Sequence, residues 1–176
     1  LEAYIVGSQV ITLTTTTVSN GNWYHVAFVR NGTSVVLYLN GVSIGSGTNS
    51  TNIAPSSSIM IGSAAHSTTD SYNGYISNLR YVNGQALYTG NFTPGTTPLT
   101  TSSVGTSGAN VAASITGTVP FLSCQSNKFV DNSTNNFALT VTGAPKVQTQ
   151  NPFQLNSGQS YYFSGSSDYL MSANTT

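Results

Sequence analysis

Charged residues are scarce in this sequence of 176 residues, which has four Lys or Arg and four Asp or Glu and a net charge of zero. Binding to DNA or RNA through the phosphate backbone requires many cationic side chains on one face. A polybasic contact with a membrane surface requires a similar cluster. The scarcity of charge therefore argues against both nucleic acid and a membrane surface as partners.

The sequence also has little cysteine and no long apolar run. Cys124 is the single cysteine, so no intrachain disulfide forms and we expect a buried, reduced thiol. No apolar run approaches the length of a transmembrane helix and no signal peptide is visible, so we expect no membrane insertion. The sequence begins with Leu rather than Met, and we expect it to be an internal slice of a longer or processed polypeptide.

The sequence lacks the motifs of common enzymes. Glycoside hydrolysis needs two carboxyl groups that flank the scissile bond, whereas this sequence has one Glu, three Asp and no close Glu-x-Asp-x-Glu pattern. No nucleophile elbow, Walker loop or zinc-ligand spacing is present. We therefore assign no catalytic residue and predict that the protein is not an enzyme.

Uncharged polar residues take the place of charge. The sequence contains 26 Ser, 25 Thr and 18 Asn, while 38% of its residues are hydrophobic and 10% aromatic. The aromatic and β-branched residues are sufficient to build a core. A surface of hydroxyl and amide groups is typical of secreted β-proteins and of virion appendages.

Strand and turn patterns run through the whole sequence. Asn31-Gly32 and Asn40-Gly41 each separate two apolar runs, and Asn-Gly is the preferred pair for the two positive-φ positions of a type I′ turn. These two pairs predict a three-stranded meander over residues 22–47. No segment shows helical periodicity with caps, and short strands at regular spacing favour an all-β sandwich or barrel.

Alternation also indicates which side chains share a face. Over residues 75–82 a single strand would place four side chains on one face: Tyr75, Ser77, Leu79 and Tyr81. Farther along the chain, four apolar residues are candidate core positions: Phe129, Phe137, Leu139 and Val141.

Two stretches resemble parts of a known family. "NWYHVAFVRNGTSVVLYLNGVSIGSGTNST" and "NGYISNLRYVNGQALYTGNFTP" resemble the C-terminal half of a concanavalin A-like, laminin-G-type (LamG) domain. Their sequence pattern resembles that of LamG repeats in large structural proteins of marine, cyanophage-like tailed phages. "FVDNSTNNFALTVTGAPKV" followed by "YYFSGSSDYL" resembles the opening of the same domain type. The resemblance implies an all-β, antiparallel jelly-roll sandwich.

The order of these two parts is inverted relative to the family. We assign residues 1–100 to the C-terminal portion of a LamG-like sandwich, 101–120 to a linker, and 121–176 to the N-terminal portion of a sandwich in the same or a neighbouring unit. Three explanations stay open: two partial domains of a tandem array, completion by circular permutation, or strand exchange with another subunit. A half-sandwich with bare edges is unfavourable, which favours completion in some form.

Candidate binding residues follow from the resemblance and from side-chain chemistry. Asp168 is the candidate calcium ligand by its position in the motif, because some LamG-like domains bind calcium at the sandwich rim; its alternative role is to form an Asx-type turn. We expect no other cofactor. Aromatic faces and amide groups bind sugars, so the candidate carbohydrate-binding residues are Tyr72, Asn73, Tyr75 and His66.

The resulting functional hypothesis is a non-enzymatic structural and adhesion module of a phage appendage, fibre or decoration protein. It would lie on the virion surface, extracellularly, and recognise a surface or host glycan through many weak sites. Its expected partners are further copies of itself or other virion structural proteins. The alternative is a purely architectural filament or capsid-decoration subunit that assembles by strand sharing and has no glycan ligand.

Overall fold

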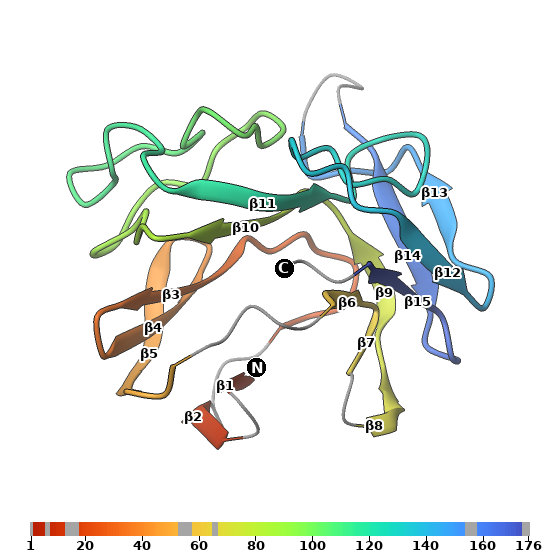
Figure 1. Ribbon diagram of the computed structural model, residues 1–176, viewed down its shortest axis with the longest axis horizontal. Coiled ribbons are helices and arrows are strands. Elements are labelled where there is room, and N and C mark those ends of the chain that lie inside the picture. Colours follow the sequence, from red (N-terminus) through yellow and green to blue (C-terminus); the bar gives the residue numbers. More distant parts are fainter. Residues whose placement is uncertain are drawn as a thin grey trace. The chain divides into compact units, whose positions relative to one another are not determined.

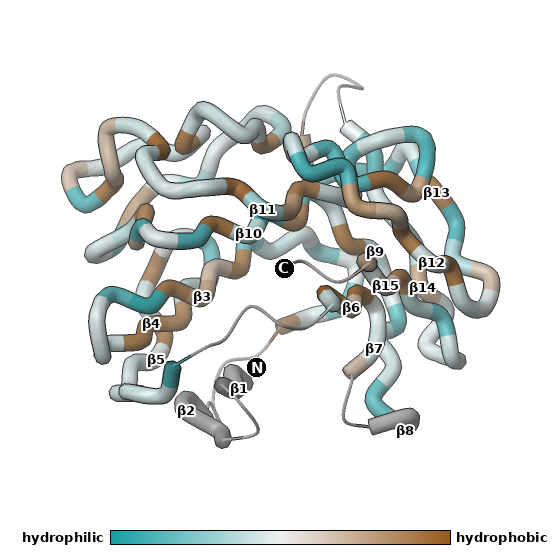
Figure 2. Tube along the Cα trace, in the orientation of Figure 1, coloured by the Kyte–Doolittle hydropathy of each residue, from teal (hydrophilic) through white to brown (hydrophobic). Residues whose placement is uncertain are grey.

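The fold is all-β. A computed structural model of the chain describes residues 2–5, 8–12, 18–52, 58–64, 67–153 and 158–173, and these residues contain no α-helix. Every strand pair is antiparallel (Figure 1). Hydrophobic and hydrophilic residues interchange along the chain (Figure 2), as expected of sheets with one buried face. The predicted all-β, antiparallel class is confirmed, and the strand arrangement agrees with a jelly-roll sandwich.

The chain forms two compact units, which are described separately. Unit 1 comprises Leu1–Ile53, Gly84–Gly95 and Ser102–Thr116. Unit 2 comprises Ala54–Asn83, Thr96–Thr101 and Gly117–Thr176. The assignment of 1–100, 101–120 and 121–176 to portions of LamG-like sandwiches stays a prediction.

Unit 1 contains a hairpin and a three-stranded sheet. The hairpin pairs β1 (Glu2–Ile5) with β2 (Ser8–Thr12). The sheet has the order β3-β4-β5, with β3 at Val26–Asn31, β4 at Ser34–Leu39 and β5 at Val42–Thr48 (Figure 1). The meander predicted over residues 22–47 is confirmed.

The two turns of this meander differ from each other. Asn40 and Gly41 have φ values of 49° and 79°, so the second turn has the two positive φ angles of type I′, as predicted. In the first turn Asn31 pairs with Ser34 and is still a strand residue. The two loop residues are therefore Gly32, with a φ of 61°, and Thr33, whose φ is not positive. The type I′ prediction for Asn31-Gly32 is wrong because the register places the turn one residue later.

Aromatic side chains pack beside this sheet in unit 1. The rings of Tyr88 and Phe92 are stacked with centroids 3.8 Å apart, and Tyr38 meets Phe92 edge-on at 5.4 Å. His25 contacts Phe92 in the same edge-on manner at 5.4 Å. Tyr88 also forms an isolated bridge with Val111. Part of the segment predicted as a linker thus lies against residues 84–95.

Unit 2 contains the remaining strands, which form four small sheets. Their orders are β12-β15-β6, β13-β14-β9, β10-β11 and β7-β8 (Figure 1). The strands are β6 (Met60–Ile61), β7 (Ser63–Ala64), β8 (Ser67–Ser71), β9 (Asn73–Ile76), β10 (Leu79–Asn83), β11 (Thr118–Ser123), β12 (Leu139–Thr142), β13 (Lys146–Gln148), β14 (Ser160–Ser164) and β15 (Tyr169–Ser172). Three strands from the second half of the sequence, β15, β14 and β11, therefore pair with β6, β9 and β10 of the same chain.

A break at Asn78 divides the single strand predicted over residues 75–82. Asn78 has a φ of 56°, and its backbone N–H donates to the carbonyl of Cys124 at 3.0 Å. Its side-chain Oδ1 accepts from the N–H of Leu99 at 2.8 Å. Because the break resets the alternation, Ile76 and Leu79 both pack against the core. The prediction that Tyr75 and Leu79 share a face is therefore wrong.

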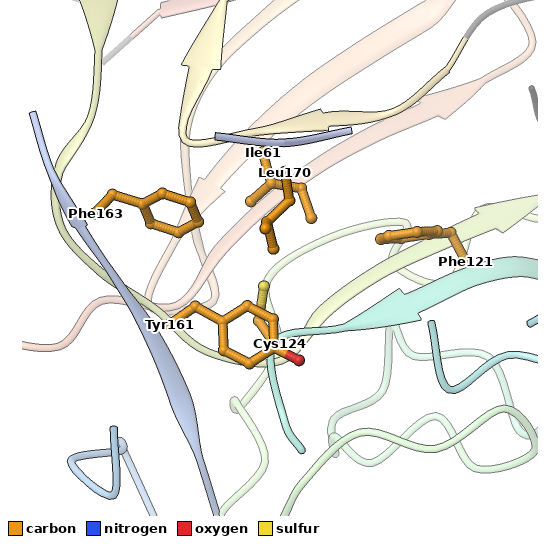
Figure 3. Packing of buried hydrophobic residues seen from close by; sticks show 6 residues of the cluster. All are labelled: Ile61, Phe121, Cys124, Tyr161, Phe163 and Leu170. Atoms are coloured by element: carbon orange, nitrogen blue, oxygen red, sulfur yellow. The ribbon is translucent and has the colours of Figure 1, made fainter. Parts of the chain in front are cut away.

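The core of unit 2 draws on both halves of the sequence. Six buried residues form it (Figure 3): Ile61, Phe121, Cys124, Tyr161, Phe163 and Leu170. Of the four predicted core positions, three pack against this cluster: Phe129, Phe137 and Leu139. Val141 is 44% exposed, because it lies on β12, which is at the edge of its sheet in the described residues and has a neighbour on one side alone.

Cys124 is a buried free thiol, as predicted. Figure 3 shows its sulfur pointing toward Leu170. Burial raises the pKa of the Cys124 thiol to about 12, while a hydrogen bond with Ser123 acts in the opposite direction. A thiol with this pKa stays protonated at neutral pH and is a poor nucleophile.

Candidate carbohydrate-binding face

The candidate site is built on the sheet β13-β14-β9. In its register Lys146 lies opposite Tyr162, and Tyr162 lies opposite Tyr75. Residues directly opposite each other in antiparallel strands project from the same face. Lys146, Tyr162 and Tyr75 therefore form one row across the three strands, which we call the tyrosine row.

The opposite face of this sheet belongs to the core. Tyr161 and Phe163 alternate with Tyr162 along β14, and both are 0% exposed. The Tyr161 hydroxyl donates to the backbone carbonyl of Lys128 and accepts from the N–H of Val130 at 3.4 Å. Buried aromatic packing thus fixes the strand that carries Tyr162.

The two tyrosine rings of the row are in contact. The centroids of Tyr75 and Tyr162 are 5.0 Å apart and their planes are tilted by 46°. Both side chains are half-buried and Lys146 is exposed. The next pair on this face, Asn73 opposite Ser164, is exposed and adds an amide and a hydroxyl group. Two adjoining aromatic rings beside hydrogen-bonding groups are suited to a sugar, which has both apolar C–H faces and hydroxyls.

Tyr72 lies next to this row without being part of it. Its backbone N–H donates to Gly62 at 2.8 Å, and its hydroxyl donates to the carbonyl of Tyr75 at 3.3 Å. A Cβ atom at Gly74 would lie 3.2 Å from the Tyr72 ring, so the glycine leaves room for that ring. Partial burial raises the pKa of Tyr72, although 47% of the residue is exposed.

The structure thus brings three of the four predicted sugar-binding residues together: Tyr72, Asn73 and Tyr75. His66 lies outside the described residues. Sequence reasoning missed Tyr162 and Lys146, because their places depend on pairing between distant strands. The one local signal is the strand-like sequence "YYF", in which alternation places Tyr162 on the face opposite to Tyr161 and Phe163. The role of all these residues in sugar binding stays a prediction.

Asp168, the candidate calcium ligand, is buried and hydrogen-bonded through both carboxylate oxygens. Its Oδ1 accepts from the N–H of Ala144 at 2.7 Å, and its Oδ2 accepts from the N–H of Ser164 at 2.9 Å. These bonds hold the pKa of Asp168 below its ordinary value. A Cβ atom at Gly143 would lie 2.2 Å from Oδ1, so the carboxylate fits closely against the turn between β12 and β13.

Asp168 thus connects two turns, but its bonds come from Ala144 and from Ser164, four residues earlier, and not from the N–H two residues later that defines an Asx turn. The residues that the structure describes contain no group of three or more His, Cys, Asp or Glu arranged to hold a metal ion. Backbone carbonyls also bind calcium, and calcium binding by Asp168 stays a prediction.

Asp131 is a second buried carboxylate, and it shapes a loop. Its Oδ1 accepts from the N–H groups of Leu122 at 3.0 Å and Ser133 at 2.9 Å. Its Oδ2 accepts from the Ser133 hydroxyl at 2.8 Å and the Phe137 N–H at 3.0 Å. A buried carboxylate with four donors is satisfied without a cation. The "DNS" sequence, which favours an Asx turn, is the signal for this role.

Comparison with known proteins finds a family to which part of the chain is similar. Residues 3–83 match the family described as the Concanavalin A-like lectin/glucanases superfamily. This stretch includes Asn73 and Tyr75 but ends before Lys146 and Tyr162. A search of curated proteins and a search of solved structures each returned no match.

The match supports the concanavalin A-like, LamG-type sandwich predicted from the sequence. At the level of function it indicates a carbohydrate-binding or adhesion-type module at most, and the description of the superfamily covers glucanases as well as lectins. In the described part of the chain no helix is long and apolar enough to span a membrane.

Proposed function

We propose that this protein is a non-enzymatic adhesion module that binds glycans at the tyrosine row. The observation that carries the proposal is the contact between Tyr75 and Tyr162, whose ring centroids are 5.0 Å apart on one face of the sheet. The match of residues 3–83 to a lectin-containing superfamily supports it. So does the chemistry of Asn73 and Ser164, which supply hydrogen bonds next to the rings.

The site would bind a sugar ring by stacking and orient it by hydrogen bonds. The outward-facing tyrosines offer an aromatic surface for the C–H face of a pyranose, and few polar groups are needed to select its orientation. Because Tyr75 and Tyr162 are half-buried and their strands are anchored by the core, little side-chain entropy is lost when a ligand binds.

We propose a virion appendage as the setting, with the module exposed on the particle surface and facing a host glycan. The uncharged, hydroxyl-rich composition and the resemblance to LamG repeats of tailed-phage structural proteins support this setting. Repeated copies, or association with other virion structural proteins, would raise a weak single-site affinity through avidity.

A glycan array tests the proposal. The full chain, displayed on a multivalent bead, should bind a defined set of glycans, and Tyr75→Ala and Tyr162→Ala should each abolish that signal. Tyr81→Ala is the matched control, because Tyr81 is 44% exposed but lies on β10, outside the tyrosine row. The proposal would be wrong if the parent chain bound no glycan, or if Tyr81→Ala lost the binding signal as completely as the two row variants.

An architectural role by strand sharing is the second candidate, and one observation favours it. In the described residues β3 is at the edge of its sheet, and it carries Val26, 50% exposed, and Phe28, 41% exposed. Val42, two strands away in the same row as Val26, is 54% exposed. Apolar edge strands are prone to pair with another chain.

Sedimentation velocity separates the two candidates. If strand sharing is the function, the chain should form oligomers that Phe28→Lys disperses without changing its circular dichroism spectrum. A parent chain that stays monomeric at high concentration contradicts the architectural role and leaves the glycan-binding proposal intact.

A further inference from the structure

We infer that the glycan recognised at the tyrosine row is acidic, with its anionic group bound by Lys146. This inference rests on the proposed function and specifies its ligand. Its basis is the register of the sheet, which places the ammonium-bearing side chain directly opposite Tyr162 and on the same face.

One ligand could contact both the tyrosine rings and the ammonium group of Lys146. Neighbouring strands are about 4.8 Å apart, so Lys146, Tyr162 and Tyr75 follow one another in steps of about one strand spacing. The flexible stem of Lys146 can pack along the edge of the Tyr162 ring while its ammonium group stays in water. A sugar stacked on the two rings would then present an equatorial acidic substituent to that ammonium group.

The charge of Lys146 is available for a ligand. In the described part of the chain this side chain is exposed and forms no hydrogen bond or ion pair. It is the only charged residue of the sheet β13-β14-β9. The carboxylate of Asp168 uses its two oxygens to accept from the N–H groups of Ala144, two residues before Lys146, and Ser164.

The other cations of the chain lie elsewhere or have partners. The guanidinium of Arg30 donates to Gly32 and Thr51 carbonyls, and that of Arg80 donates to Thr100. Lys128 is exposed on the loop after Cys124. All four Lys and Arg residues of the chain are described. Among these four, Lys146 is the one in the same row as the two tyrosines.

Matched pairs of oligosaccharides test this inference on the full chain. One pair consists of alginate oligosaccharides and the same molecules after reduction of their carboxyl groups. The second pair consists of dextran oligosaccharides with and without sulfation. We expect the parent chain to bind at least one acidic member about two- to fivefold more tightly than its neutral counterpart, as for an exposed ion pair. The pair that shows the preference identifies the anion as carboxylate or sulfate.

Variants assign the preference to a residue. Lys146→Gln should bring the ratio of acidic to neutral affinity to about one, Lys146→Arg should keep the parent ratio, and Lys128→Gln should leave it unchanged as the charge-matched control. Added salt should reduce the preference in the parent chain but not in Lys146→Gln.

The outcomes separate this inference from the proposed function. Equal binding of acidic and neutral members by the parent chain, or a preference that survives in Lys146→Gln, overturns the acidic-glycan inference alone. Binding that Tyr162→Ala leaves unchanged, or no binding of any oligosaccharide, overturns the proposed function together with the inference.

Discussion

Tyr75 and Tyr162 lie with their ring centroids 5.0 Å apart, although they come from opposite halves of the sequence. The contact exists because β14 pairs with β9 in the same chain. It joins a residue inside the stretch that matches the lectin-containing superfamily to a residue outside that stretch. The proposed binding face therefore depends on the folding of both halves together.

Two glycine substitutions test the hairpin geometry of unit 1. A Cβ atom at Gly41, where φ is 79°, would lie 2.0 Å from the carbonyl oxygen of Phe92, whereas a Cβ atom at Gly32, where φ is 61°, has open space. Gly32→Ala should lower the free energy of unfolding by about 1–2 kcal/mol through backbone strain alone. Gly41→Ala should lower the free energy of unfolding by more than Gly32→Ala does, because the backbone of Phe92 must also move. Urea unfolding measures the free energy of unfolding of both variants. An equal decrease in the two variants would contradict the close approach of Gly41 to the Phe92 carbonyl.

The stability contributed by Asp168 should depend on pH. Asp168→Asn retains one acceptor but turns an amide NH2 toward a backbone donor, so we expect a loss of about 1–3 kcal/mol near neutral pH. The folded pKa of Asp168 is below its ordinary value of 3.8, so its contribution is present above that pH and is lost as the pH falls through the folded pKa. The difference between parent and variant should therefore shrink below about pH 4. A difference that is constant with pH would exclude this linkage.

Calcium distinguishes the two roles of Asp168. Since both of its oxygens accept N–H hydrogen bonds, we expect the melting temperature of the parent chain to be the same in calcium chloride and in EDTA. A calcium-dependent rise that disappears in Asp168→Asn would instead establish the metal-binding role.

The Cys124 thiol should be inert in the folded protein. Its pKa of about 12 and its complete burial predict no reaction with a thiol reagent at pH 8 until a denaturant is added. The raised folded pKa also predicts that stability falls as the pH rises from about 9, where the unfolded thiol ionises, toward about 12. Cys124→Ala should lose this alkaline dependence. Rapid labelling under native conditions would show that the thiol is accessible.

Local features of the fold were predictable from the sequence, and features that depend on distant partners were not. The Asn40-Gly41 turn was predictable because its residues directly favour the required backbone angles. The break at Asn78 was not, since its left-handed conformation is held by contacts with Cys124 and Leu99. The turn between β3 and β4 was predicted in part: the hairpin is present, but its turn lies one residue later than predicted.

The same distinction applies to the candidate site. Tyr72, Asn73 and Tyr75 are neighbours in sequence, so a polar, aromatic cluster could be predicted from their spacing. Tyr162 and Lys146 join them through strand pairing alone, and no local pattern reveals which distant strand pairs with β9. The position of Asp168 in its motif made it a candidate site residue. Its hydrogen bonds with Ala144 and Ser164 could not be predicted, because the folded turns bring these residues together.

The most direct test of the tyrosine row is a calorimetric titration of the full chain with a glycan selected on the array. We expect Tyr162→Ala and Tyr75→Ala each to raise Kd by about tenfold or more, as for an aromatic residue at the centre of an interface. Tyr81→Ala should leave Kd unchanged, and all three variants should keep the parent circular dichroism spectrum. An unchanged Kd for folded Tyr162→Ala would show that the glycan does not bind at the tyrosine row.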